Sequence, residues 1–234
     1  MRRSKQAGIN FLNDPRLAER IVSAVDYSGK DVLEVGAGLG QLTRFFQNYR
    51  SLTLIERESD FAERLRKSFP AATVINEDAL KVQWPKFDVF VSNMPYSISS
   101  PLLEKLWNSS FEVGVVTIQK EVADRITALP KTKDYSRLSI MMQLKFNVQR
   151  EFDIPPSKFT PSPKVYSTVL RLERRDTKIP DGFDEFLKLL FSQRRKKLRN
   201  ILDSESSGEK RPEELTLPEL IELFEKISAR QRSL

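Results

Sequence analysis

One segment constrains the fold more than any other: a short apolar run that leads into a cluster of glycines. Residues 31–35, Asp-Val-Leu-Glu-Val, are typical of a buried strand, and Gly36, Gly38 and Gly40 follow at once. Glycine lets a backbone turn sharply and approach a ligand without a Cβ atom in the way. A strand that passes through such a turn is typical of sheets that bind nucleotide-like cofactors.

The rest of the first 120 residues repeats an alternation of short apolar runs and amphipathic segments. We predict further strands at residues 51–55, 73–75, 87–91 and 113–118. We predict helices at residues 15–25, 42–49, 59–68 and 101–107. Strands that alternate with helices indicate an α/β fold, in which helices cover both faces of a mostly parallel sheet.

The pattern changes after residue 150. A proline-rich loop at residues 154–163 precedes a closing strand at 165–173, and the remainder is predicted to be helical at 183–202 and 217–227. The Ser/Gly/Glu-rich residues 203–212 between these helices are expected to be mobile. The simplest organisation is an α/β domain over residues 1–175 and a small helical domain over residues 176–234.

Two carboxylates follow the second and third predicted strands. Glu56 lies 20 residues after Gly36, a spacing that suits hydrogen bonds from ribose hydroxyls, and we expect it at a solvent-facing strand end. Asp78 follows the third strand, where a carboxylate can meet an adenine amino group. Nicotinamide-binding loops normally have the pattern Gly-x-Gly-x-x-Gly, whereas here the third glycine comes one residue earlier and Glu34 precedes the loop. The set favours S-adenosylmethionine as cofactor, on a Rossmann-like methyltransferase sheet.

A tetrapeptide, Asn93-Met94-Pro95-Tyr96, follows the fourth predicted strand. In a doubly wound sheet the carboxyl ends of the strands form the ligand crevice. We expect the Asn93 side-chain oxygen and the Met94 carbonyl to accept the two N–H bonds of a planar amino group, which favours a more pyramidal nitrogen. Pro95 would stiffen the turn, and Tyr96 would offer a ring on which a base stacks. The alternative is an ordinary turn, but the position after the fourth strand favours catalysis.

The composition excludes several kinds of chemistry. The chain contains no cysteine and no histidine. Thiolate nucleophiles, histidine general bases and zinc sites built on these residues are therefore impossible, and we expect no metal site. For the same reason we expect no rate-controlling ionisation near neutral pH. The formal charge of +7 favours a polyanionic partner such as a nucleic acid.

Residues 193–200, on the predicted helix 183–202, carry a run of cations and no acid. We expect this helix to pack one apolar face and to offer its cations to RNA phosphates. The alternative is a solvated helix face. The candidate RNA-binding residues are Arg194, Arg195, Lys196, Lys197 and Arg199. Further candidates are Lys120, Arg125, Arg137 and Lys164.

Together these motifs resemble the universal small-subunit rRNA adenine dimethyltransferases (KsgA-type). The resemblance runs from residue 10 to the end, with weaker detail after residue 176. Its segments are residues 10–14, 31–43, 54–56, 77–79, 93–101, 119–125, 135–139 and 155–165. The chain departs from the family at Met94, where leucine is usual, and in its short C-terminal part. These two features, with Lys-Val-Tyr-Ser at residues 164–167, resemble archaeal members.

The resemblance implies S-adenosylmethionine-dependent dimethylation of two adjacent adenines in a hairpin near the 3′ end of small-subunit rRNA. It implies that Phe159 helps to hold a flipped adenine opposite Tyr96. The cofactor-binding residues that the motifs and the resemblance indicate are Asn10, Leu12, Gly36, Gly38, Glu56, Asp78 and Asn93.

Other functions use similar residues. A nucleic-acid-binding assembly or transcription factor on the same fold would not need the acids and Asn93, so these residues favour an enzyme. The basic segment argues against a small-molecule methyltransferase and less strongly against a DNA adenine methyltransferase. We expect a cytoplasmic monomer that acts on the immature small ribosomal subunit. We expect no membrane span, and no secretory signal because no apolar stretch follows the basic residues 1–5.

Overall fold

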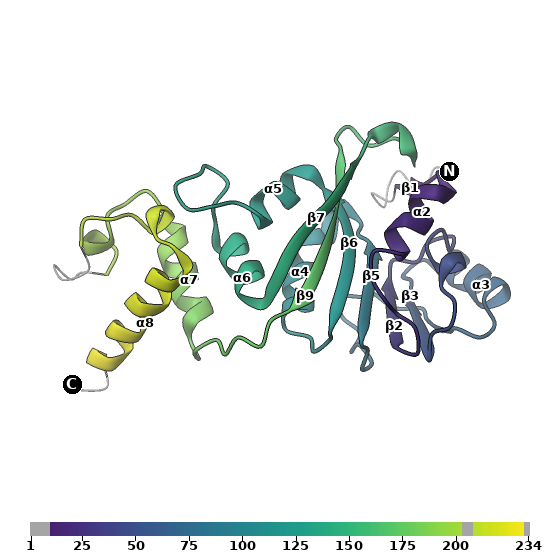
Figure 1. Cartoon of the computed structure of the whole chain (residues 1–234), viewed down its shortest axis with the longest axis horizontal. Helices are drawn as coiled ribbons and strands as arrows, with labels where there is room; N and C mark the ends of the chain where they lie inside the picture. Colours follow the sequence, from purple (N-terminus) through teal and green to yellow (C-terminus); the bar gives the residue numbers. More distant parts are fainter. Residues whose placement is uncertain (1–9, 203–207, 232–234) are drawn as a thin grey trace. The chain divides into compact units, whose positions relative to one another are not determined.

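The computed structural model describes residues 10–202 and 208–231, drawn in Figure 1. Contacts divide the chain into two compact units: the first ends at Ala123 and resumes with Asn147–Arg174, and the second comprises Asp124–Phe146 and the chain from Arg175 onward. The predicted domains, residues 1–175 and 176–234, stay a prediction, and the contacts group residues 124–146 with the C-terminal part. The basic residues 1–5 and part of the Ser/Gly/Glu-rich segment lie outside the described residues.

The first unit is built on a seven-stranded sheet with the strand order β4-β3-β2-β5-β6-β9-β7 (Figure 1). The strands from β4 to β6 in this order pair in parallel, and β9 pairs antiparallel to β6. Their bounds are β2 Asp31–Val35, β3 Ser51–Ile55, β4 Thr73–Ile75, β5 Val89–Asn93, β6 Val113–Gln119, β7 Phe146–Ile154 and β9 Ser167–Arg174. The predicted α/β fold with a mostly parallel sheet is therefore confirmed.

Both faces of the central strands are buried. Successive strand residues point to opposite faces, and on one face Val32 packs in an apolar cluster with Ile21 of helix α2, Pro15–Val22. On the other face Leu33 and Phe90 are fully buried. A parallel sheet covered on both faces requires strands that are almost continuously apolar, which is the pattern that the sequence shows. The other helices of this unit are α3 Ser59–Ser68 and α4 Ser99–Trp107, while α5, Lys120–Ile126, runs from the first unit into the second.

A separate two-stranded sheet joins residues that are far apart in the chain. Strand β1, Phe11–Leu12, pairs antiparallel with β8, Phe159–Thr160. Asp14 then caps α2, because its carboxylate accepts hydrogen bonds from the N–H groups of Arg16 and Leu17. This pairing fixes the entry segment that leads into the first helix.

The predicted helix at residues 42–49 is wrong. Only a short 3₁₀ turn, Thr43–Phe45, forms there. Asn48 adopts a left-handed conformation with φ of 57°, and its carbonyl accepts the N–H of Gly29 at 2.7 Å. The chain needs this bend to turn into β3, so tertiary contacts override the helical pattern.

The second unit is helical. Its helices are α6 Arg137–Lys145, α7 Phe183–Ser192 and α8 Leu217–Gln231. The predicted helix 183–202 is too long, because α7 ends at Ser192 and is followed by turns and a 3₁₀ segment, Leu198–Asn200. The basic residues 193–200 therefore do not form the expected helix face. Among the described residues, no helix has the length and apolar character needed to cross a membrane.

Candidate active site

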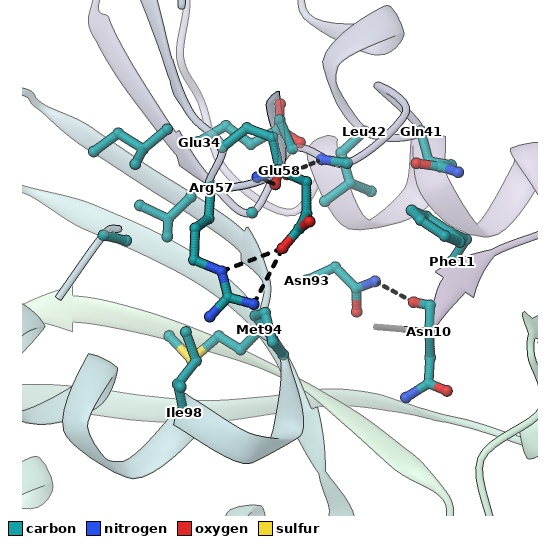
Figure 2. Close-up of a pocket in the computed structure, with 18 of the residues that line it drawn as sticks. Asn10, Phe11, Glu34, Gln41, Leu42, Arg57, Glu58, Asn93, Met94 and Ile98 are labelled. Atoms are coloured by element: carbon teal, nitrogen blue, oxygen red, sulfur yellow. Dashed lines mark hydrogen bonds and ion pairs between the residues drawn. The ribbon is translucent and has the colours of Figure 1, made fainter. Parts of the chain in front are cut away.

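A pocket in the first unit lies where loops follow the carboxyl ends of β2, β3, β4 and β5 (Figure 2). It contains about 960 Å³ of empty space, including space open to solvent. Most of the predicted cofactor-binding and catalytic residues line it: Asn10, Leu12, Gly36, Gly38, Glu56, Asp78, Asn93, Met94, Pro95 and Tyr96. Residues from five separate segments thus meet at one edge of the sheet.

The glycine turn after β2 forms one wall of the pocket. Gly36 and Gly38 have φ values of 73° and 57°, in the left-handed region that favours glycine. The Gly36 N–H donates to the carbonyl of Ile55 at 2.8 Å. A Cβ atom on Gly38 would lie 2.9 Å from a ring carbon of Phe11. The turn therefore requires glycine both for its backbone conformation and for its close packing.

Glu56 lies inside the pocket wall, so the expectation of a solvent-facing strand end is wrong. The residue is 5% exposed. Its two carboxylate oxygens accept backbone N–H groups, from Gly38 at 2.8 Å and from Glu58 at 2.8 Å. Burial raises the pKa of this carboxyl, while the backbone hydrogen bonds act in the opposite direction. Glu56 therefore ties the glycine turn to the loop after β3.

Glu34 is a second buried carboxyl in the pocket lining. It is 2% exposed, and one of its oxygens accepts the Thr43 hydroxyl at 2.6 Å. Burial raises the pKa of Glu34 to about 7. The absence of histidine and cysteine therefore does not leave the site without a group whose pKa lies near neutral pH, because the fold removes this carboxyl from water. The expectation of no rate-controlling ionisation near neutral pH stays a prediction.

The loop after β4 is held by a lysine that the sequence analysis did not single out. Lys105 of α4 donates to the carbonyls of Ala79 and Val82 at 2.8 and 2.5 Å. Asp78 accepts the N–H of Leu80 at 2.9 Å through one carboxylate oxygen. These bonds close the loop into a turn and leave the Asp78 carboxylate on the pocket wall.

Asn93 ends β5 and its side chain is directed toward the entry segment (Figure 2). The Asn93 Nδ2 group donates to the backbone carbonyl of Asn10 at 3.1 Å. An amide has one donating group and one accepting oxygen. Because the donating group is bonded to Asn10, the orientation leaves Oδ1 as the acceptor of this side chain.

The tetrapeptide that follows is fixed by the neighbouring strands. The Met94 N–H donates to the carbonyl of Thr117 at 3.0 Å, and the Met94 side chain is only 1% exposed. The Tyr96 hydroxyl shares a 2.6 Å hydrogen bond with Ser167 of β9. Burial raises the pKa of Tyr96. Backbone and ring are therefore positioned by contacts with β6 and β9.

Phe159 lies outside this lining. It is 3% exposed, and its Cα pairs with that of Leu12 in the β1–β8 ladder. It belongs to the apolar cluster that includes Val91 and Val115. Its predicted role beside an adenine stays a prediction, and in this structure the ring supports the strand that carries Leu12.

The lining fits S-adenosylmethionine in its chemistry. Glu56 and Asp78 offer carboxylate oxygens that accept hydroxyl and amino hydrogens, while Ile55, Ala79 and Ile98 offer apolar surface. The positive-φ glycine turn brings backbone into the wall without intervening Cβ atoms. Acceptors for the polar groups and apolar surface for a purine are thus both present.

The basic residues predicted to bind RNA belong to the second unit. Arg194 donates to two backbone carbonyls, and Lys197 and Arg199 both pair with Glu209. Arg195 and Lys196 are exposed. Arg137, a further candidate, forms a two-pronged ion pair with Asp184 at 2.5 and 2.7 Å. Several of these cations are thus used to hold the unit together.

The chain matches the family model described as "Ribosomal RNA adenine dimethylase" over residues 2–220. It is 46% identical over 225 residues to the "Probable ribosomal RNA small subunit methyltransferase A" of Pyrobaculum aerophilum, covering 94% of this chain and 96% of that protein. It is 38% identical over 241 residues to the ribosomal RNA small subunit methyltransferase A of Thermotoga maritima, covering 97% and 86%. The solved structure of a dimethyladenosine transferase from Plasmodium falciparum is similar, with a TM-score of 0.87 and 27% identity over 94% of this chain and 98% of that one.

Proposed function

Because the chain belongs to the ribosomal RNA adenine dimethylase family, we propose that it transfers methyl groups from S-adenosylmethionine to the exocyclic amino groups of two adjacent adenines. Its target is a hairpin near the 3′ end of small-subunit rRNA. The observation that carries the proposal is the arrangement of Asn93, whose Nδ2 group is bonded to the Asn10 carbonyl and whose oxygen remains an acceptor. The comparisons give no support to a binding protein without catalysis.

The cofactor-holding residues divide into two groups. Gly36 and Gly38 bring backbone to the cofactor, and the Glu56 carboxylate accepts from its ribose hydroxyls. Asn10, Leu12 and Asp78 close the site from the entry segment and from the loop after β4. When bound, S-adenosylmethionine supplies an electrophilic methyl group on a sulfonium that is already a good leaving group. No nucleophilic side chain is then needed, in keeping with a chain that has no cysteine or histidine.

The target amino group is held by two acceptors. The Asn93 Oδ1 atom and the Met94 carbonyl accept its two N–H bonds and favour the pyramidal nitrogen whose lone pair can react. The backbone of Met94 is pinned by the 3.0 Å bond from its N–H to Thr117, and Pro95 stiffens the turn. Holding reactants in an aligned geometry is a large source of rate acceleration, and rigid acceptors provide that alignment.

The adenine ring is held by aromatic side chains. Tyr96 stacks on one face of the base, with its ring oriented by the Ser167 hydroxyl at 2.6 Å. Phe159 would support the opposite side, which requires its buried ring to become accessible when the adenine enters. Stacking a single base on an aromatic ring contributes about 1–3 kcal/mol, enough to offset part of the cost of unstacking the target.

The natural substrate is the immature small ribosomal subunit, and the enzyme acts as a monomer in the cytoplasm. Labelled S-adenosylmethionine, unmodified small subunits and the full chain, followed by mapping of the label by mass spectrometry, test the proposal. We expect two dimethylated adenines that are adjacent in the 3′-terminal hairpin. Label confined to large-subunit rRNA, to DNA or to no nucleic acid would contradict it.

A further inference from the structure

Three of the five cations in the basic segment are engaged within the second unit. The Lys197 ammonium lies 2.5 Å from a Glu209 carboxylate oxygen, and Arg199 pairs with the other oxygen of the same carboxylate. These two ion pairs lower the pKa of Glu209. A cation that is already paired gains less from a phosphate, because the internal pair must first be broken. The segment is therefore not a uniform row of phosphate contacts.

Arg194 is engaged in a different way. Its guanidinium donates to the backbone carbonyl of Lys133 at 2.9 Å and to that of Tyr135 at 3.1 Å. Its Nε atom lies 3.6 Å from a Glu213 carboxylate oxygen. The side chain is 30% exposed. Arg194 thus links the segment after α7 to the loop that precedes α6.

The loop is fixed from a second side. Lys131 has a left-handed conformation with φ of 69°, which is unusual for a residue with a side chain. Its N–H donates to the backbone carbonyl of Glu213 at 2.7 Å. The Tyr135 hydroxyl donates to the carbonyl of Leu215 at 3.0 Å, and Tyr135 is 2% exposed. Both ends of residues 131–135 are therefore held in place.

Four cations remain on these two linked segments. Lys131, Lys133, Arg195 and Lys196 are exposed, and within the part of the chain that the structure describes their side chains form no ion pair. Arg194 joins the two segments through the carbonyls of Lys133 and Tyr135, and Glu213 contacts both Arg194 and the backbone of Lys131, so the four cations lie on backbone segments that touch each other. The acids on or beside these two segments are Asp134 within the loop, Glu213, which faces Arg194, and Glu209, which pairs with Lys197 and Arg199.

We propose that Lys131, Lys133, Arg195 and Lys196 form one phosphate-binding patch for the rRNA backbone, and that Arg194 is the positioning residue that assembles it. The inference rests on the proposed function and adds to it a loop, residues 131–133, that lies outside the basic segment. Like charges held close together on a fixed backbone repel one another, and a strand of phosphates relieves that repulsion by displacing counterions. RNA fits better than a single anion because the cations come from two segments rather than from one closed cavity.

The salt dependence of binding to unmodified small-subunit rRNA tests the patch. A variant with Lys131→Gln and Lys133→Gln should lower the log–log salt slope by about 1.4–1.8, because each lost phosphate contact removes roughly 0.7–0.9. A variant with Arg195→Gln and Arg194 retained should lower the salt slope by roughly 0.7–0.9, the value for one lost phosphate contact. The control replaces Lys178 and Lys226, cations of the same unit, with Gln; it removes as much charge and should leave the slope unchanged. A loop variant with the wild-type slope would refute the patch.

The positioning role of Arg194 needs a separate readout. Arg194→Lys keeps the charge but cannot donate to two carbonyls in a planar fork. We expect its salt slope to fall as in the loop variant, since the loop is no longer held, with folding verified by circular dichroism. A folded Arg194→Lys protein with the wild-type slope would show that Arg194 acts only as a charge. Anionic phospholipid vesicles test whether the patch serves a membrane instead of RNA. If the loop variant binds such vesicles less tightly than the wild type does but binds RNA equally well, the proposal is overturned.

Wild-type protein separates this inference from the proposed function. If it binds and methylates small-subunit rRNA while the loop variant keeps the wild-type slope, the patch fails and the function stands. If the wild type neither binds nor methylates this RNA, the function fails, and the patch loses its ligand with it.

Discussion

Glu34→Gln isolates the pH dependence that one buried carboxyl gives to stability. Glu34 is 2% exposed, and burial raises its pKa from an ordinary value of 4.5 to about 7. Between these two values the folded state binds this proton more tightly than the unfolded chain does. The stability that the protonated group contributes is therefore fully present below pH 4.5 and is lost as the pH rises through about 7.

The expected magnitude follows from the same values. An interval from 4.5 to about 7 corresponds to about 3 kcal/mol, at roughly 1.4 kcal/mol for each pH unit. Glutamine keeps an oxygen that can accept the Thr43 hydroxyl, now 2.6 Å from the carboxylate, but it does not ionise. Relative to wild type, Glu34→Gln should therefore gain about 3 kcal/mol between about pH 4 and pH 8, or roughly 6–12 °C in Tm for a unit of this size.

Urea unfolding at a series of pH values measures this difference directly. Glu121→Gln is the matched control, because Glu121 is an exposed acid outside the pocket lining and its removal should leave the curve parallel to that of the wild type. If the curves for wild type and Glu34→Gln also run parallel from about pH 4 to pH 8, Glu34 does not carry a buried proton and the reasoning is refuted.

Three further substitutions test other contacts. Glu56→Ala should weaken S-adenosylmethionine binding by about 1.5–3 kcal/mol. It should also lower the free energy of unfolding by about 1–3 kcal/mol, because two backbone N–H groups lose their acceptor. Calorimetry that shows unchanged cofactor affinity in the folded variant would exclude Glu56 from the site. Thr117→Val should raise stability by about 1 kcal/mol, since the buried hydroxyl has no hydrogen-bond partner among the described residues, and a lower Tm would contradict this. Tyr96→Phe should lose only the hydrogen bond to Ser167, about 1 kcal/mol. Tyr96→Ala should in addition lose the stacking of the base, about 1–3 kcal/mol. Equal kcat/KM values for the two variants would contradict stacking.

The parts of the fold predicted best are those with strong local signals. The runs at residues 31–35, 51–55 and 73–75 form strands with these same bounds, and residues 59–68 form α3. Apolar runs between turn residues determine such elements almost alone. The family resemblance, drawn from ordered motifs, is confirmed by the match over residues 2–220.

The elements that were wrong depend on distant contacts. The expected helix at residues 42–49 gives way to a left-handed Asn48 that bonds Gly29, and the helix at 183–202 stops where Arg194 reaches the Lys133 and Tyr135 carbonyls. No local pattern reveals either contact, since both join segments that are remote in sequence.

The location of the site could be predicted, but its electrostatics could not. Because the carboxyl ends of parallel strands lie along one edge, residues after β2, β3, β4 and β5 were expected to meet, and the pocket lining has them together. Sequence alone does not give burial, so it placed Glu56 in solvent and overlooked the raised pKa of Glu34. Both errors concern carboxyls that the fold takes out of water.

The rate of a single turnover by Asn93→Ala on unmodified small subunits tests the central claim most directly. Removing the side chain deletes one acceptor of the amino group and the bond to Asn10. We expect methylation to slow by about 100-fold or more, as for misaligned reactants, while RNA binding is retained and Met94→Leu, which keeps the backbone carbonyl, stays close to the wild-type rate. Methylation by folded Asn93→Ala at the wild-type rate would contradict the account, and the tetrapeptide would then be a structural turn.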